Sequence, residues 1–205
     1  MAETNVVDSF LPSTHGLHFA NRFPPGPTVR FGPLDPRWFR IGDASSGLCG
    51  GMAWFVRERF EAGQPVPAET EAPANGSPLF QALVRRQVKS LEWGRTPLGF
   101  WRMGAFGADH MARRTREREW PGIRATIDGG RLAMVGLVRS RGLDPRKLTQ
   151  NHQVLAYGYE VTDDTIRLRL YDPNWPNRDD VTVSIESGGM TQSTGERLLG
   201  VLSLG

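Results

Sequence analysis

The chain has 205 residues, of which 39% are hydrophobic, and a formal net charge of +3. This length and apolar content predict a single domain over residues 1–205 and argue against a disordered chain. The single cysteine, Cys49, excludes an intrachain disulfide and a zinc site made of several cysteines, and no apolar run is long enough to span a membrane.

The first part of the chain is expected to be irregular and then helical. Residues 1–48 are rich in Pro, Gly and Phe and predict an irregular segment that wraps around the domain. Residues 49–129 are mainly helical in this prediction, because apolar residues recur there at helical spacing between loops rich in Pro and Gly. The expected helices cover about residues 49–61, 78–93 and 108–119, and a short one follows Pro121.

From residue 130 to residue 205 the pattern changes to that of strands. Apolar or alternating runs between turn residues predict four or five antiparallel strands, at about residues 132–138, 153–160, 165–171, 181–185 and 198–204. Helices that precede a run of strands are typical of an α+β fold, here with N-terminal helices packed on a C-terminal antiparallel sheet.

Cys49 is a candidate nucleophile because it stands at the expected start of a helix, after a turn of small residues. The unpaired N–H groups and the positive end of the helix dipole favour a thiolate there. His152 and Asp172 follow later in the chain and supply a candidate base and orienting group. Each residue alone also has an ordinary structural interpretation, since a lone cysteine is most often a small buried side chain.

The expected hairpin of residues 153–171 brings the base and its orienting group together. In an antiparallel hairpin centred near Asp163, residues whose numbers sum to about twice that of the centre face each other. His152 then lies opposite residues 172–174. We expect Asp172 to hold one imidazole nitrogen while the other faces the thiol, and Asn174 is the alternative orienting group.

At these residues the chain resembles the papain-like cysteine peptidase superfamily, and within it the bacterial peptidases that cut leader peptides after a double glycine. Those proteins share a Cys at the start of a helix, a His that begins a strand in a His-x-Val-x-x-x-Gly context, and an Asp-Pro that ends the next strand. His152, Val154 and Gly158 match the second element, and Asp172-Pro173 matches the third. The resemblance implies a papain-like fold with the active site between the nucleophile helix and the sheet.

The oxyanion-binding residue departs from that family. Its members usually carry a Gln about six residues before the nucleophile, and the corresponding residue here is Asp43. An ionised carboxylate repels a developing oxyanion, so Asp43 is unsuited to the role. The Cys49 N–H remains as one donor, and the Ser45 or Ser46 hydroxyl is a candidate for the second.

These features leave three classes of function open. The first is a thiol hydrolase, a peptidase or amidase that acts on a peptide or small amide through a thioester on Cys49. The second is a transglutaminase-like acyltransferase, in which an amine or another thiol resolves the same thioester. The third is a papain-like scaffold that binds a partner without turnover.

Other partners and cofactors are not expected. The arginine-rich residues 111–119 also contain acidic side chains, which predicts a solvated helix face rather than the clean basic stripe of a nucleic-acid site. No phosphate-binding glycine loop or metal-ligand spacing is present in the sequence. Because no signal peptide precedes the domain we expect a cytoplasmic protein, with export by a non-standard route left open. The sequence does not predict an oligomeric state.

Overall fold

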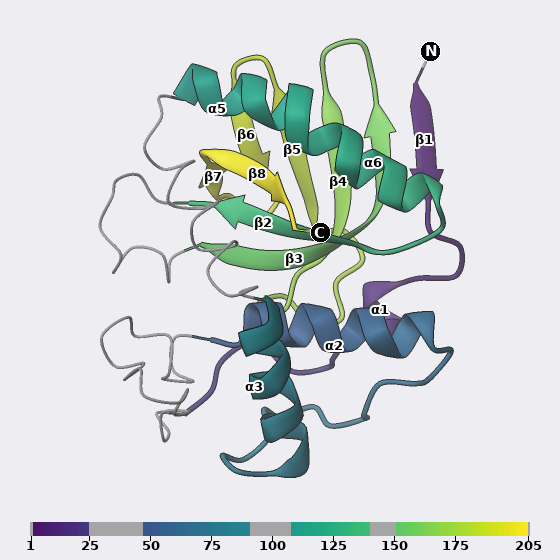
Figure 1. Ribbon diagram of the computed structural model, residues 1–205, viewed down its shortest axis with the longest axis vertical. Coiled ribbons are helices and arrows are strands. Elements are labelled where there is room, and N and C mark those ends of the chain that lie inside the picture. Colours follow the sequence, from purple (N-terminus) through teal and green to yellow (C-terminus); the bar gives the residue numbers. More distant parts are fainter. Residues whose placement is uncertain (1, 25–46, 91–107, 140–150, 205) are drawn as a thin grey trace.

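The computed structural model describes residues 2–24, 47–90, 108–139 and 151–204. These ranges form a mixed fold of helices and one curled, antiparallel half-barrel sheet (Figure 1). The helices are α1 (Pro12–His15), α2 (Cys49–Glu61), α3 (Pro78–Ser90), α5 (Ala108–Arg114), the π-helix η4 (Thr115–Glu119) and α6 (Trp120–Asp128). The strands are β1 (Glu3–Val6), β2 (Ala133–Val138), β3 (His152–Val161), β4 (Ile166–Tyr171), β5 (Thr182–Glu186), β6 (Gly189–Gln192), β7 (Arg197–Leu198) and β8 (Gly200–Ser203).

The sheet is larger than the sequence analysis predicted, because it contains eight strands among the described residues. The order of the strands in the sheet is β7-β6-β5-β4-β3-β2-β8. On the same side of β3, β2 pairs with residues 152–156 and β1 pairs with residues 158–161. The predictions missed β1 and β6, which are short and contain few apolar residues, so they lack the periodicity that identifies a strand. The single strand predicted at residues 198–204 is replaced by two short strands, β7 and β8.

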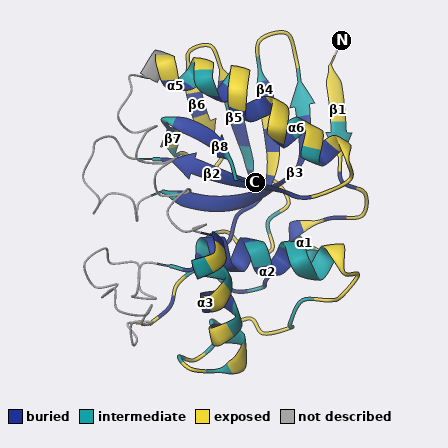
Figure 2. Cartoon of the chain, in the orientation of Figure 1, coloured by how far each residue is buried: buried dark blue, intermediate teal, exposed yellow. Residues whose placement is uncertain are grey.

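The core lies along the central strands. All six residues of β2 and the first eight of β3 are buried, whereas β4 alternates between buried and exposed positions over its first four residues. Figure 2 shows this band of buried residues across the middle of the sheet. Strands buried on both faces are expected to read as continuous apolar runs, which is why the sequence identified β2 and β3 clearly.

Helices α2 and α3 lie below β3 in the view of Figure 1, and α2 contacts β3 directly. The bounds of α2 agree with the prediction for residues 49–61. Helix α3 packs on α2 and buries Phe80, Leu83 and Val84. Its start is capped, because the Phe80 N–H donates to the Ser77 hydroxyl at 3.2 Å.

Helices α5, η4 and α6 form one continuous rod from Ala108 to Asp128 above β3, where the prediction had two separate helices. The middle of the rod is the π-helix, and Pro121 follows it in the first turn of α6. Proline lacks an N–H and ends most helices, but it is tolerated in a first turn, and the wider π turn lets the chain continue through it.

The π-helix also covers the edge of the sheet at β8. The Thr115 hydroxyl donates to the Val201 carbonyl at 3.2 Å and accepts from the Val201 N–H at 3.1 Å. The Glu119 carboxylate accepts from the Ser203 N–H at 3.1 Å. Side chains thus satisfy the free backbone groups of this edge strand, which would otherwise offer a template for another strand.

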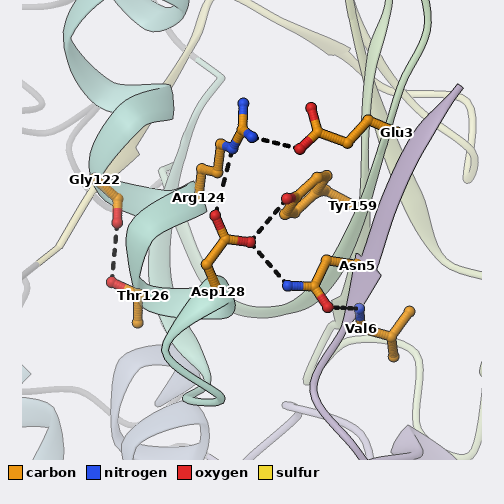
Figure 3. Close-up of polar contacts among 8 residues, drawn as sticks. All are labelled: Glu3, Asn5, Val6, Gly122, Arg124, Thr126, Asp128 and Tyr159. Carbon is orange, nitrogen blue, oxygen red and sulfur yellow. Dashed lines mark hydrogen bonds and ion pairs between the residues drawn. The ribbon is translucent and has the colours of Figure 1, made fainter. Parts of the chain in front are cut away.

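Strand β1 is joined to the sheet and to α6 by the polar contacts drawn in Figure 3. Asp128 accepts from the Asn5 amide and the Tyr159 hydroxyl, both at 2.8 Å, and Arg124 pairs with Glu3. The sequence analysis assigned residues 1–48 to an irregular segment and therefore missed both β1 and α1. Within the described ranges, no helix has the length and apolar character needed to cross a membrane.

Candidate active site

Cys49 is the first residue of α2 and is partly exposed. Two glycines follow it because the helix start is tightly enclosed. A Cβ on Gly51 would overlap the Leu83 carbonyl of α3, and one on Gly50 would meet Ser90 and Gln153. The two glycines after Cys49 therefore have a packing cause of their own, apart from any role of the cysteine.

The free N–H groups of this helix start are partly satisfied from other elements. The Gly51 N–H donates to the Gln87 side chain of α3 at 2.8 Å, and the Leu48 N–H donates to the Asn21 side-chain oxygen at 2.6 Å. Asn21 also occupies the space beside Gly47, whose φ of 86° suits glycine. A helix end without its own side-chain cap is thus held by α3 and by the N-terminal segment.

His152 is the first residue of β3 and is only 3% exposed. Its Nε2 lies 2.6 Å from Oδ1 of Asp172, and its side chain also hydrogen-bonds the Cys49 side chain. Because an imidazole has two nitrogens, Nδ1 is left for the thiol. The sequence-predicted nucleophile, base and orienting group are therefore brought together, although they come from α2, β3 and the loop after β4.

The pairing of β3 with β4 explains how Asp172 reaches the histidine. A register shift between Ala156 and Gly158 brings Leu155 opposite Tyr171, the last residue of β4. If the same pairing is extended by one residue on each strand away from the turn, Asp172 lies opposite Val154. Residues 152 and 154 share one face of the strand, so Asp172 is the diagonal neighbour of His152 on that face.

Asp172 is 1% exposed and accepts three hydrogen bonds. Its Oδ1 accepts from His152 and from the Asn174 N–H at 2.8 Å, and its Oδ2 accepts from the Gln192 amide at 2.6 Å. Burial by itself would raise the pKa of this carboxyl, but the His152 charge and these donors lower it below its ordinary value. Asp172 is therefore held as a carboxylate.

The same physics favours an ion pair between the other two residues. Burial by itself would lower the pKa of His152, but Asp172 and the Cys49 thiolate raise it to about 10. Burial by itself would raise the pKa of the Cys49 thiol, but the charge and hydrogen bond of His152, and the N–H groups of Gln153 and Gly50, lower it. The favoured state is a thiolate beside an imidazolium, the nucleophilic form of a cysteine.

Asn174, the alternative orienting group, has a different place. Its backbone N–H donates to Asp172, and its side-chain oxygen accepts from the Asn21 amide at 3.2 Å. The group that contacts the His152 ring is Asp172. Asn174 acts on the ring through the carboxylate and joins the turn after β4 to the segment that holds Leu48.

The sequence reasoning missed two side chains of the site, Gln192 on β6 and Asn21. Neither lies in a recognisable motif, and each becomes relevant only because a distant element folds next to it. The candidate oxyanion donors Ser45 and Ser46, and Asp43 before them, lie outside the described residues.

Comparison of the chain with protein-family models, with curated proteins and with solved structures found no match. In the described part of the chain, no group of three or more His, Cys, Asp and Glu side chains is arranged so that it could hold a metal ion. His15 and His18, for example, contact the Leu11 N–H and the Asn177 side chain respectively.

Proposed function

We propose that this protein is a thiol hydrolase, a peptidase or amidase with a papain-like arrangement of helix and sheet. The observation that carries the proposal is the buried His152, whose two nitrogens are divided between the Asp172 carboxylate at 2.6 Å and the Cys49 thiol. A packed core cysteine needs neither a charged partner nor a helix start. The lowered pKa of Cys49 has its cause in that same geometry.

The proposed reaction begins when the Cys49 thiolate attacks the carbonyl carbon of an amide. The C–S bond forms, and the carbonyl electrons move to oxygen. The imidazolium of His152 then gives its Nδ1 proton to the leaving amine as the C–N bond breaks, which leaves a thioester. Water attacks this thioester while His152 removes a proton, and the thiolate is released with the acid product. Asp172 keeps the ring oriented and stabilises its charged form throughout.

The oxyanion needs at least one N–H donor. The backbone N–H of Cys49 is suited to this role because the first N–H groups of a helix have no acceptor within the helix. The proposal leaves the second donor to Ser45 or Ser46. Either hydroxyl is neutral, which the Asp43 carboxylate is not.

An acyl-transfer assay with an activated ester tests the proposal. We would treat the protein with p-nitrophenyl acetate at pH 7 and search for an acetyl group on Cys49 by mass spectrometry. The expected result is a burst of p-nitrophenol with acetylated Cys49, followed by slower turnover. The Cys49→Ser variant should show neither the burst nor the adduct, and Met52→Leu, a volume-conserving change in the same helix, should behave like the unchanged protein.

The remaining classes give different results in the same assay. Faster release of acetyl groups as the amide of an added primary amine would indicate an acyltransferase. A cysteine that is neither acetylated at neutral pH nor alkylated before denaturant is added would contradict the proposal and support the scaffold that binds without turnover.

A further inference from the structure

A second layer of side chains stands behind Asp172. Gln192, the last residue of β6, is 2% exposed, and its Nε2 donates to Oδ2 of Asp172 at 2.6 Å. This is the carboxylate oxygen that does not face His152. Strand β5 separates β6 from β4 in the sheet, so this contact depends on the long Gln side chain and on the curl of the sheet.

Arg139 determines which end of the Gln192 amide faces the carboxylate. Its Nη2 donates to Oε1 of Gln192 at 3.2 Å, and because a guanidinium only donates, the amide oxygen must point toward it. The amide nitrogen is then left for Asp172. Arg139 is itself held by an ion pair with Glu196 at 2.5 Å.

The same arginine is connected to the strand that carries the histidine. The Arg139 N–H donates to the Asn151 side chain at 3.0 Å, and Asn151 immediately precedes His152. Arg139 follows β2, the strand that pairs with this end of β3 through Leu137 and His152. One residue thus contacts the segments that position both the base and its orienting carboxylate.

A purely structural interpretation makes a different prediction for these residues. Gln192 could simply satisfy a buried carboxylate, and its loss would then change stability alone. An oriented donor on Oδ2 does more than this, because it stabilises the ionised form of Asp172 over the protonated form. That ionised form is what stabilises the imidazolium, and the imidazolium in turn stabilises the thiolate.

We infer that Gln192 is a positioning residue that keeps Asp172 ionised and oriented, and that Arg139 sets the direction of the Gln192 amide. The inference rests on the proposed function, because it concerns the same triad. It adds two residues, Arg139 and Gln192, to the triad. Arg139 orients Gln192, and Gln192 affects the thiolate of the triad through the Asp172 carboxylate.

The test is the pH dependence of Cys49 alkylation by iodoacetamide, measured between pH 4 and 9 in the Gln192→Leu variant. Without the donor on Oδ2, Asp172 is a weaker partner for the imidazolium, so thiolate formation should need a higher pH. We expect the alkylation rate at the acid side of the curve to fall about three- to tenfold, because hydrogen bonds to charged groups are strong. Met190→Leu, a volume-conserving change at a buried residue on the same strand, is the matched control and should leave the curve in place.

A second pair of variants keeps the test informative if Gln192→Leu does not fold. Arg139→Met leaves Gln192 in place but removes the donor that orients its amide, and it should shift the curve in the same direction by a smaller amount. Arg139→Lys restores a cation that donates to the amide oxygen, and it should recover part of the shift. A structural defect alone would lower stability in these variants without moving the curve.

The two possible failures can be separated. If the unchanged protein already alkylates with the pH dependence of a free thiol, near pH 8.5, the proposed function itself is wrong. If the unchanged protein forms its thiolate well below that pH, but folded Gln192→Leu or Arg139→Met gives the same curve, the inference about positioning is overturned and the proposed function stands.

Discussion

Two carboxylates of this protein, Asp172 and Asp128, make similar numbers of contacts in very different surroundings. Each accepts hydrogen bonds from three neighbours, and these contacts help to lower the pKa of each. The side chain of Asp172 is 0% exposed, whereas that of Asp128 is 40% exposed.

The difference teaches that the number of hydrogen bonds does not decide what a carboxylate does. Water can replace any partner that Asp128 loses and screens its charge, so its contacts only help to place β1 against α6. Water cannot replace the partners of Asp172. The state of the buried carboxylate is therefore coupled to the charge of His152 and, through it, to the reactivity of Cys49.

The largest effect that distinguishes the two regions should come from removing each carboxylate. Asp172→Ala leaves His152 buried without its partner, and breaking a buried charge pair in this way costs about 3–5 kcal/mol. Asp128→Ala should cost far less, since the Asp128 carboxylate lies at an exposed position where water can take its place. Urea unfolding of both variants measures the two changes. Equal losses of unfolding free energy would mean that burial does not set Asp172 apart from Asp128.

The buried pair should also give stability a particular dependence on pH. The pKa of His152 in the folded protein, about 10, lies above its ordinary value of 6.5, so between these values His152 keeps a proton in the folded protein that it loses in the unfolded chain. The resulting stability is fully present below pH 6.5 and is lost as the pH rises toward 10. The gap in unfolding free energy between the unchanged protein and Asp172→Asn should close over this range. The gap for Asp128→Asn should not change there.

A smaller effect is expected on the chemistry of the cysteine. His152→Gln removes the charge that lowers the pKa of Cys49, and at pH 6.5 a thiol of ordinary pKa is only about 1% ionised. Alkylation by iodoacetamide at that pH should slow by about tenfold or more, because the fewer thiolates are only partly compensated by their higher nucleophilicity. Arg124→Gln, on the exposed cluster, serves as the control. Unchanged alkylation in His152→Gln would mean that the helix start alone activates the thiol.

The smallest effect should be the response to salt. Arg124 and Glu3 form an exposed ion pair, and salt screens such pairs over a length of about 10 Å at 0.1 M and 3 Å at 1 M. The destabilisation caused by Arg124→Gln should therefore shrink as salt is raised, while that of Asp172→Ala should stay nearly constant. A strong salt dependence in Asp172→Ala would show that water and ions reach the buried site.

Local sequence signals were sufficient for the elements that carry the triad. The helix of residues 49–61 and the hairpin that begins at His152 rest on short-range features, namely a small-residue turn before an apolar run and two strand-like runs around Thr162-Asp163-Asp164. Such features act within a few residues of each other, so they can be read without knowing the fold. Placing Cys49, His152 and Asp172 on these elements was enough to propose them as a triad.

Contacts between distant segments decided the rest. Nothing near Gln192 in the sequence indicates a buried donor, because its partner lies 20 residues earlier and two strands away in the sheet. The same holds for Asn21, which supports the turn before Cys49, and for β1, whose residues are held by α6. A polar residue becomes part of a site only when folding removes its water and supplies another partner, and that pairing depends on the order of the strands rather than on local propensity.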